Sequence, residues 1–432
     1  MEYPKYNEYL DSTIDWLGRV PNHWIVKKIK WDSAVLRGAS PRPIDDPAFF
    51  DDNGKYAWVR IADVTASGKH LEKTTQRLSK LGASLSVKIK PENIFLSIAG
   101  SVGKPCISKI DCCIHDGFVY FPYLKINHNF LYYIFASGEP YKGLGKFGTQ
   151  LNLNTETVGS ISIAIPSETE QESIIRFLDK ETTRINNLIE KKLNLIHTLN
   201  ENRIAIISHA VTKGLNEIVH LKSSEVDWLE NVPEHWKEKA LKYTCTLNDK
   251  ALAETTDPEY VINYVDIGSI DKTKGIIKKE QYLFDEAPSR ARRIVQDGDI
   301  LVSTVRTYLR AIAPVINPEE NLIVSTGFAV VRPRKIDSDY LSFLLRSKYF
   351  VEKVVSLSVG VSYPAINASV LARIKIPIPP TEEQKEITQY LKKETESIDK
   401  IVGLTEKHID KLKEYKTAII SAAVTGKIKV SE

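Results

Sequence analysis

Residues 12–24 read STIDWLGRVPNHW and residues 224–236 read SEVDWLENVPEHW, so eight of thirteen positions are identical at an offset of 212. An internal repeat of this kind fixes the architecture before any other signal is weighed. The repeated segment indicates that the chain contains two copies of one structural unit. We therefore expect two similar halves related by a pseudo-twofold axis.

A second pair of repeated segments closes each half. PSETEQESIIRFLDKET from Pro166 recurs as PPTEEQKEITQYLKKET from Pro379, and ENRIAIISHAVTKG from Glu201 recurs as EYKTAIISAAVTGK from Glu414. Both pairs have an offset of 213. Because ordered markers recur with almost no drift, the pattern predicts a tandem duplication of about half the protein.

The length and composition indicate a globular protein of more than one domain. A chain of 432 residues exceeds one ordinary core, and its 42% hydrophobic and 26% charged residues exclude disorder. No apolar run approaches the roughly 18 residues of a membrane span, and the first residues lack the apolar core of a signal peptide. We expect a cytoplasmic protein with no membrane partner. The four cysteines include no CxxC pair, which favours buried reduced thiols over disulfides or zinc.

The strongest helical signals lie at residues 167–213 and 381–425. Each stretch follows proline and opens with a predicted capping box, Ser167 with Glu170 and Thr381 with Gln384. Apolar residues then recur at steps of three and four, which is typical of a coiled-coil seam. The predicted helix-packing residues are Ile174, Phe177, Ile185, Leu188, Leu195, Leu199, Ile387, Leu391, Ile398, Ile401, Ile409 and Leu412.

These helices are predicted to end at Gly214 and Gly426, while Gly403 inside the second is expected to weaken or kink it. A helix of about 44 residues is roughly 65 Å long, so the pair would be a spacer as well as a packing element. We expect the two helices to pair as an antiparallel coiled coil. The seam has two interpretations: it only holds the chain or a dimer together, or it also binds another protein.

Two regions of short β-rich runs lie around these helices, so the predicted fold class is mixed α/β (α+β). The matched segments inside them are YAWVRIADV at 56–64 with INYVDIGSI at 262–270, ENIFLSIAGSVGK at 92–104 with GDILVSTVRTYLR at 298–310, and DGFVYF at 116–121 with TGFAVV at 326–331. The predicted domains are 1–165, 166–214 for the first helix, 215–379, and 380–432 for the second helix. A shared framework with divergent residues between the matches predicts two readers of different targets.

The motifs of common enzymes are missing or lack their context. GLGKFG at 143–148 satisfies GxGxxG but precedes a strand-like run, so we interpret it as a loop; GSVGKP at 100–105 ends in proline and is interpreted as a turn. The sequence holds no HExxH, no GxSxG and no Asn/Asp-Pro-Pro-aromatic motif. His23 and His235 belong to the repeated PxHW motif, where packing beside tryptophan is more typical than catalysis. We predict that the chain is not an enzyme and holds no metal or cofactor.

Charge is distributed unevenly along the chain. Residues 16–165 hold 19 Lys and Arg against 12 Asp and Glu, whereas residues 228–379 hold 21 against 19. Basic residues nevertheless cluster in the second region, at SRARR from 289 to 293 and around Arg306 and Arg310. Local clusters matter more than totals for binding a polyanion.

The order WLGxVPxHW, divergent block, and EQxxIxxxLDxET running into a long helix that ends AVTxG closely resembles the specificity subunit of type I restriction-modification systems. The resemblance spans nearly the whole chain. It implies that each divergent block is a target recognition domain reading one half of a bipartite site in double-stranded DNA. It also implies that the helices space the domains and hold two methyltransferase subunits, which methylate adenine with S-adenosylmethionine, while restriction (motor) subunits join for cleavage. The missing catalytic motifs agree with this picture.

Sequence-specific reading of DNA requires Arg or Lys toward guanine and Asn or Gln toward adenine, while other basic residues hold phosphates. In the first domain the predicted DNA-binding residues are Arg60, Lys104, Lys142, Lys146, Thr149 and Gln150. In the second they are Arg290, Arg292, Arg293, Arg306, Tyr308, Arg310, Ser362 and Tyr363.

Three alternatives stay open at the level of sequence. The chain could be an architectural coiled-coil dimerisation module without sequence-specific DNA binding, which predicts no salt-sensitive affinity for DNA. It could be an enzyme using the glycine-rich loop on a nucleotide, which predicts nucleotide protection against thermal unfolding. It could also be a specificity subunit that serves methylation alone.

Overall fold

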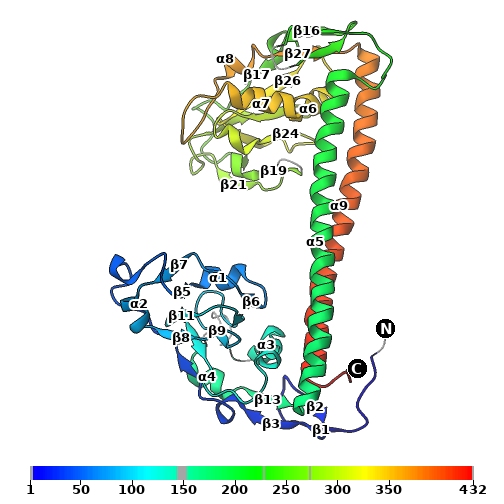
Figure 1. Ribbon diagram of the computed structural model, residues 1–432. Helices are drawn as coiled ribbons and strands as arrows, with labels where there is room; N and C mark the ends of the chain where they lie inside the picture. The colour runs from blue at the N-terminus through cyan, green and yellow to red at the C-terminus, as the bar shows by residue number, and fades with distance from the viewer. Residues whose placement is uncertain (1–2, 143, 145–152, 227–228, 272–273, 431–432) are drawn as a thin grey trace. The chain divides into compact units, whose positions relative to one another are not determined.

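The computed structural model describes residues 3–142, 144, 153–226, 229–271 and 274–430. It divides into two compact units, Met1–Lys192 with Glu406–Glu432 and Leu193–Thr405. Two long helices, α5 (Glu168–Lys213) and α9 (Thr381–Val424), each contribute residues to both units (Figure 1). Each compact unit therefore combines a β-rich domain with part of each helix, whereas the predicted domains treat the helices as separate segments.

The first unit contains two main sheets, with strand orders β4-β12-β9-β10-β6 and β7-β5-β11-β8. The strands are β1 (Tyr9–Asp11), β2 (Arg19–Pro21), β3 (Ile25–Lys28), β4 (Leu36–Arg37), β5 (Tyr56–Val59), β6 (His70–Leu71), β7 (Gln76–Leu78), β8 (Val87–Ile89), β9 (Ile94–Ser97), β10 (Pro105–Ser108), β11 (Cys112–Ile114), β12 (Phe118–Tyr120) and β13 (Ser162–Ile165). The helices are α1 (Ile61–Ala66), α2 (Lys80–Ser84), α3 (His128–Ala136) and α4 (Thr155–Ser160).

The second unit has the strand orders β17-β26-β23-β24 and β21-β18-β25-β22. Its strands are β14 (Leu221–Ser223), β15 (Asn231–Pro233), β16 (Lys237–Ala240), β17 (Cys245–Leu247), β18 (Val261–Val265), β19 (Ile270–Asp271), β20 (Gly275–Ile276), β21 (Glu280–Leu283), β22 (Ala291–Ile294), β23 (Ile300–Ser303), β24 (Ile312–Pro314), β25 (Leu322–Ser325), β26 (Phe328–Pro333) and β27 (Lys375–Ile378). Its helices are α6 (Ser338–Arg346), α7 (Lys348–Ser356) and α8 (Ala368–Leu371).

The two units share one topology, and the mixed α/β class is confirmed. The order β4-β12-β9-β10 in the first unit corresponds to β17-β26-β23-β24 in the second, and the other two sheets correspond in the same way. The matched sequence segments form equivalent strands, β5 with β18, β9 with β23 and β12 with β26. All four residues of β9 and of β23 are buried, because apolar runs fill the centre of each sheet. The four cysteines are buried and free, as the sequence predicts.

In the first unit, the repeated HW motif holds the start of α5. Trp24 Nε1 donates a hydrogen bond of 3.1 Å to Glu170 Oε1, and His23 Nε2 lies 3.1 Å from Glu170 Oε2. The hydroxyl of Tyr6 also donates to Glu170. One carboxylate at the first turn of the helix therefore gathers three side chains from the N-terminal segment.

In the second unit the same contacts recur at the start of α9. Trp236 Nε1 donates to Glu383 Oε2 at 3.0 Å, and His235 Nε2 lies 2.8 Å from the same oxygen. The histidines of the repeat thus pack and hydrogen-bond against a structural carboxylate. We call each of these arrangements, Trp24 with Glu170 and Trp236 with Glu383, a Trp–Glu clasp.

The predicted capping box at Ser167 forms only in its first half, whereas at Thr381 the Gln384 N–H donates to the carbonyl of Pro380 instead. The backbone N–H of Glu170 does donate to Ser167 Oγ at 3.4 Å, but the carboxylate of Glu170 turns to the clasp instead of returning to Ser167. The Gln384 side chain accepts a hydrogen bond from the Asp337 backbone N–H at 2.9 Å and does not cap Thr381. The side chains of Glu170 and Gln384, which the local pattern predicts to cap the helices, instead make tertiary contacts.

Within each unit the segments of α5 and α9 lie side by side and antiparallel (Figure 1). In the first unit Lys416 of α9 donates to Asn186 of α5 at 2.8 Å, while Ile174 shares a core with Ala423. In the second, Arg203 of α5 pairs with Asp399 of α9. Sequence position rises along one helix as it falls along the other.

The predicted seam needs a correction at Leu188, Leu195 and Ile401, which are 36%, 44% and 45% exposed. The residues that follow Leu188 and Leu195, Ile189 and Ile196, are partly buried in their place. Neighbouring residues of an α-helix point about 100° apart around its axis. Only one residue of each Leu-Ile pair can therefore face the partner helix.

The remaining predicted packing residues are at least partly removed from solvent. Ile174, Ile185, Ile387, Leu391, Ile398 and Ile409 are buried. Phe177, Leu199 and Leu412 are half-buried. α9 continues through Gly403 as one helix, so the glycine does not end it.

The glycines that follow the two helices adopt left-handed conformations, with φ of +78° at Gly214 and +69° at Gly426. A Cβ at Gly426 would lie 2.3 Å from Pro21 Cδ, whereas the nearest atom to a Cβ at Gly214 is Glu383 Oε1 at 3.0 Å. A proline ring cannot rotate away from the contact, but a glutamate tip can.

We expect Gly426→Ala to lower the free energy of unfolding by about 2–3 kcal/mol and Gly214→Ala by about 1 kcal/mol. Both substitutions place a side chain at positive φ, and only the first adds an unrelieved clash with Pro21. Denaturant unfolding followed by tryptophan fluorescence measures both values. Equal losses for the two variants would contradict the role of the Pro21 contact.

No helix in the described part of the chain combines the length and apolar character needed to cross a membrane.

Candidate nucleic-acid interface

The loop between β23 and β24 carries three of the predicted DNA-binding residues on its surface. Arg306, Tyr308 and Arg310 are all exposed. A single 3-10 turn, Thr307–Leu309, separates the two arginines, which have φ values of 51° and 54°. Such left-handed conformations are uncommon for residues other than glycine and often mark functional positions.

A second loop packs against the first and holds it. Val305 forms an isolated β-bridge with Ala365, and Thr307 Oγ1 donates to Ser358 Oγ at 2.8 Å. The Ile366 N–H donates to the carbonyl of Thr304 at 2.8 Å. These bonds fix the two loops relative to each other.

The packing of these loops brings two predicted residues together. The guanidinium of Arg306 lies over the ring of Tyr363, 5.2 Å from its centroid. Tyr363 is 67% exposed, Tyr308 is 53% exposed, and Val361 is fully exposed. Ser362 lies on the same exposed segment. We call Arg306, Tyr308, Ser362 and Tyr363 the arginine–tyrosine surface.

This surface has the chemistry of a nucleic-acid contact. An arginine guanidinium can donate two hydrogen bonds to the major-groove edge of guanine or to a phosphate. An exposed tyrosine ring can stack or pack against bases and sugars. The stacked ring also restricts the Arg306 side chain, which reduces the entropy lost on binding.

The basic segment around β22 is only partly available for binding. Arg290 is exposed. Arg292, at a register shift in β22, lies over the ring of Phe284 at 4.6 Å and donates to the carbonyl of Ala291. Arg293 is half-buried, and its Nε has no partner among the described residues. The three arginines therefore do not form one uniform exposed cluster.

Backbone contacts connect this segment with the loops above. The N–H of Thr326 donates to the carbonyl of Arg290 at 2.8 Å, and Thr304 donates to the carbonyl of Gly327 at 2.8 Å. Thr326 and Gly327 are adjacent in the chain. Two backbone hydrogen bonds therefore connect Arg290 with Thr304, where the Arg306 loop begins. The fold places them in one region of the second unit.

The predicted residues of the first unit do not gather in the same way. Arg60 donates to Gln76 and lines a cleft that also holds Asp45, Asp51, Asp52 and Asp116. Lys104 Nζ donates to the carbonyls of Thr65 and Ser67, at 2.7 and 3.0 Å, and burial lowers its pKa. Lys142 pairs with Glu139 at 2.8 Å. Lys146, Thr149 and Gln150 lie outside the described residues.

Sequence reasoning missed several basic residues that the structure brings together in the first unit. Lys69, Lys413 and Lys416 line one cavity with Lys104. The available signal was the offset of 213, which aligns Asn186 with Asp399 and thereby shows a carboxylate missing from the first half. Within the described ranges, no three His, Cys, Asp or Glu side chains gather to hold a metal ion.

The chain matches the model of the family described as type I restriction modification DNA specificity domain, at residues 40–198 and 233–414. The type I restriction enzyme MjaVIII specificity subunit of Methanocaldococcus jannaschii is 29% identical over 63% of this chain and 63% of the relative. The putative MjaX specificity subunit of the same organism is 26% identical over 65% of this chain and 62% of the relative. The alignments thus span less than two thirds of these relatives' lengths.

Two solved structures have a similar fold. A chain described under "Structural basis underlying complex assembly and conformational transition of the type I R-M system" has a TM-score of 0.69 at 15% identity, over 94% of this chain and 98% of its own. The HsdS subunit from Thermoanaerobacter tengcongensis has a TM-score of 0.51 at 15% identity, over 95% and 98%. At this identity the likeness concerns the fold.

The family match covers most of both halves of the chain. The matched family is described as a DNA specificity domain, and both named relatives are specificity subunits. The chain therefore belongs to the family of type I restriction modification DNA specificity domains.

Proposed function

We propose that each β-rich domain of this chain reads one half of a bipartite, gapped DNA site, and that the chain directs methyltransferase subunits to that site. The paired helices set the number of unread bases between the half-sites. The methyltransferase subunits bring S-adenosylmethionine and methylate adenine, and restriction subunits join for cleavage.

The observation that carries this proposal is the difference between equivalent loops on one shared framework. In the aligned segments Arg306 and Arg310 of the second domain correspond to Gly100 and Lys104 of the first. Gly100 and Arg306 both adopt positive φ, 62° and 51°, so the two loops begin alike. Beyond this position they differ, because the next positive φ falls at Gly103 in the first loop and at Arg310 in the second. Two similar scaffolds with different exposed residues suit the reading of two different half-sites.

The exposed apolar side chains of the long helices support docking of another protein. Large hydrophobic residues remain on the surface of α5 and α9 after each unit has packed. They are Leu188, Leu193, Leu195, Ile204, Tyr390, Ile401, Leu404 and Tyr415. Large apolar side chains that stay exposed on a helix are available for contact with a partner protein. We assign contacts with the methyltransferase subunits to these exposed side chains.

Adenine methylation across a genome tests the proposal. Cells that express this chain with a cognate methyltransferase subunit are compared with cells that express the methyltransferase alone. We expect a two-part, gapped motif to be methylated only when the chain is present. If a folded, coexpressed chain produces no such motif, the proposal is contradicted and the architectural alternative gains weight.

A further inference from the structure

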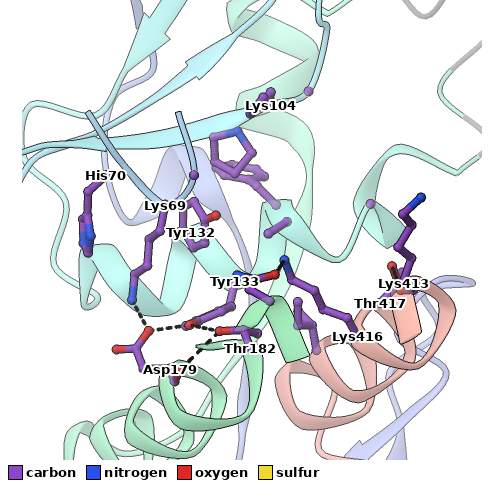
Figure 2. Close-up of a pocket in the computed structure, with 18 of the residues that line it drawn as sticks. Lys69, His70, Lys104, Tyr132, Tyr133, Asp179, Thr182, Lys413, Lys416 and Thr417 are labelled. Carbon is purple, nitrogen blue, oxygen red and sulfur yellow. Dashed lines mark hydrogen bonds and ion pairs between the residues drawn. The ribbon is translucent and has the colours of Figure 1, made fainter. Parts of the chain in front are cut away.

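A cavity of about 810 Å³ lies in the first unit between α3 and the two long helices. Its lining includes four lysines, Lys69, Lys104, Lys413 and Lys416, and one carboxylate, Asp179 (Figure 2). The cavity therefore carries three more positive than negative side chains. A concave site with an excess of one charge concentrates ions of the opposite sign.

The single carboxylate is already occupied. Asp179 accepts from Lys69 and from the hydroxyl of Tyr133, as the dashed lines in Figure 2 show. His70 adds no charge at neutral pH, because burial lowers its pKa. The neighbouring carboxylate of Asp410 lies 3.4 Å from Lys413, but both side chains are more than 60% exposed, so solvent weakens this pair.

Lys104 and Lys416 have no ion pair among the described residues, and Lys416 has fewer acceptors than Lys104. The Nζ of Lys416 donates to Asn186 Oδ1 at 2.8 Å. The side chain is half-buried, and burial lowers its pKa. A neutral amide oxygen satisfies one of its three donors without balancing its charge.

The second unit has a carboxylate at the position where the first unit has the neutral Asn186. At the offset of 213, Arg203 corresponds to Lys416 and Asp399 corresponds to Asn186. Arg203, only 11% exposed, pairs with the carboxylate of Asp399. The same position in the duplicated fold thus has an internal anion in one unit and a neutral side chain in the other.

A second polar group in the cavity wall also lacks a partner. The hydroxyl of Tyr141 is buried and makes no hydrogen bond within the described part of the chain. An unpaired buried hydroxyl is unfavourable, since it has lost its hydrogen bonds to water. Because the oxygen itself is buried, a ligand in the cavity does not reach it, and only the lysines favour a ligand there.

We propose that this cavity binds a phosphate group, whose oxygens take the place that the Asp399 carboxylate has in the second unit. Lys416 supplies N–H donors, and Lys413 and Lys104 add positive charge to the cavity wall. Phosphate oxygens accept several charge-assisted hydrogen bonds at once, which a single carboxylate cannot match. The phosphate belongs to a DNA backbone or to a free phosphate ester, and only the first source rests on the proposed function.

The test introduces the missing carboxylate with Asn186→Asp in the full-length chain. Inorganic phosphate is titrated at matched ionic strength, and its affinity is obtained from the shift in thermal unfolding. We expect Asn186→Asp to weaken phosphate binding by about tenfold or more, because the new carboxylate pairs with Lys416 and repels the ligand. Lys416→Gln should weaken binding similarly.

The matched control is Asn187→Asp, which adds the same charge at the next, exposed position of α5 and outside the cavity. It should bind phosphate like the parent chain. Equal phosphate affinity in the parent and Asn186→Asp chains would overturn the proposal, as would equal losses from the two Asp variants.

A second arm identifies the source of the phosphate. If Asn186→Asp weakens binding of unrelated duplexes equally and makes the salt dependence shallower, the phosphate belongs to the DNA backbone. If duplex binding is unchanged while inorganic phosphate binding is lost, the ligand is a free phosphate ester. The two proposals can fail separately. If the chain directs methylation of a gapped motif but Asn186→Asp does not change its phosphate affinity, only the cavity proposal is overturned.

Discussion

Arg332→Met should lower the free energy of unfolding by about 3–5 kcal/mol. Arg332 is 2% exposed and donates two hydrogen bonds to the fully buried Asp299, from Nε to Oδ1 at 2.9 Å and from Nη2 to Oδ2 at 2.7 Å. The hydrogen bonds that Arg332 donates to Asp299 raise the pKa of the guanidinium. Removing the arginine leaves a buried carboxylate without its counter-charge between β23 and β26.

Arg334→Met is the matched control for this substitution. Arg334 pairs with Asp249 at 3.0 Å, but its side chain is 53% exposed, so we expect a loss below about 1 kcal/mol. Chemical denaturation followed by circular dichroism measures both variants. The double variant Arg332→Met with Asp299→Asn should recover part of the loss, since it removes the uncompensated charge. Similar losses for Arg332→Met and Arg334→Met would contradict the buried-pair argument.

Replacing Arg306 and Arg310 together with alanine should reduce methylation at the half-site that we propose the second domain reads, by about tenfold to a hundredfold. Both side chains are exposed, and the loop is held by Val305 and Thr307, so the substitutions leave the loop in place. The measurement uses duplexes in which one half-site at a time is varied. The other half-site should be read as before.

The matched control is Lys335→Ala, which removes one exposed positive charge after the far end of β26. It should leave the reading of both half-sites unchanged. Equal weakening by the double variant across unrelated sequences, with a shallower salt dependence, would make the arginines phosphate contacts rather than readers of bases. No change on any duplex would remove the arginine–tyrosine surface from the interface.

The repeat was sufficient to predict the architecture, because duplicated segments must form duplicated elements. The helices around α5 and α9 and the matched strands follow from the sequence in this way. The partners of individual side chains do not. Glu170 fits a capping box by its spacing from Ser167, yet it binds Trp24, which lies 146 residues away in the chain. Local patterns cannot describe a contact that only tertiary packing creates.

The register of the helix seam could have been predicted better from the repeat itself. Leu195 and Ile196 are equally apolar, so hydrophobic spacing alone does not choose between them. The offset of 213 aligns Ile196 with Ile409, which is buried, and aligns Leu188 with Ile401, which is exposed like it. Two copies of one seam must use equivalent positions.

For the candidate site, the sequence was sufficient to predict the residues but not the orientation of their side chains. Arg306 and Tyr363 were predicted separately, and their stacking arises because two loops pack together. Lys104 was predicted by the same reasoning, yet its ammonium bonds to carbonyls of its own domain. The direction of a long basic side chain depends on neighbouring acceptors that composition does not reveal.

The antiparallel pairing of α5 with α9 also constrains how the two halves of this chain can evolve. Asn186 from the first copy contacts Lys416 from the second, and Arg203 from the first pairs with Asp399 from the second. Each interhelical contact therefore joins residues encoded by different copies. A substitution on one helix must therefore fit the sequence of the other copy, whereas exposed loop residues such as Arg306 carry no such constraint.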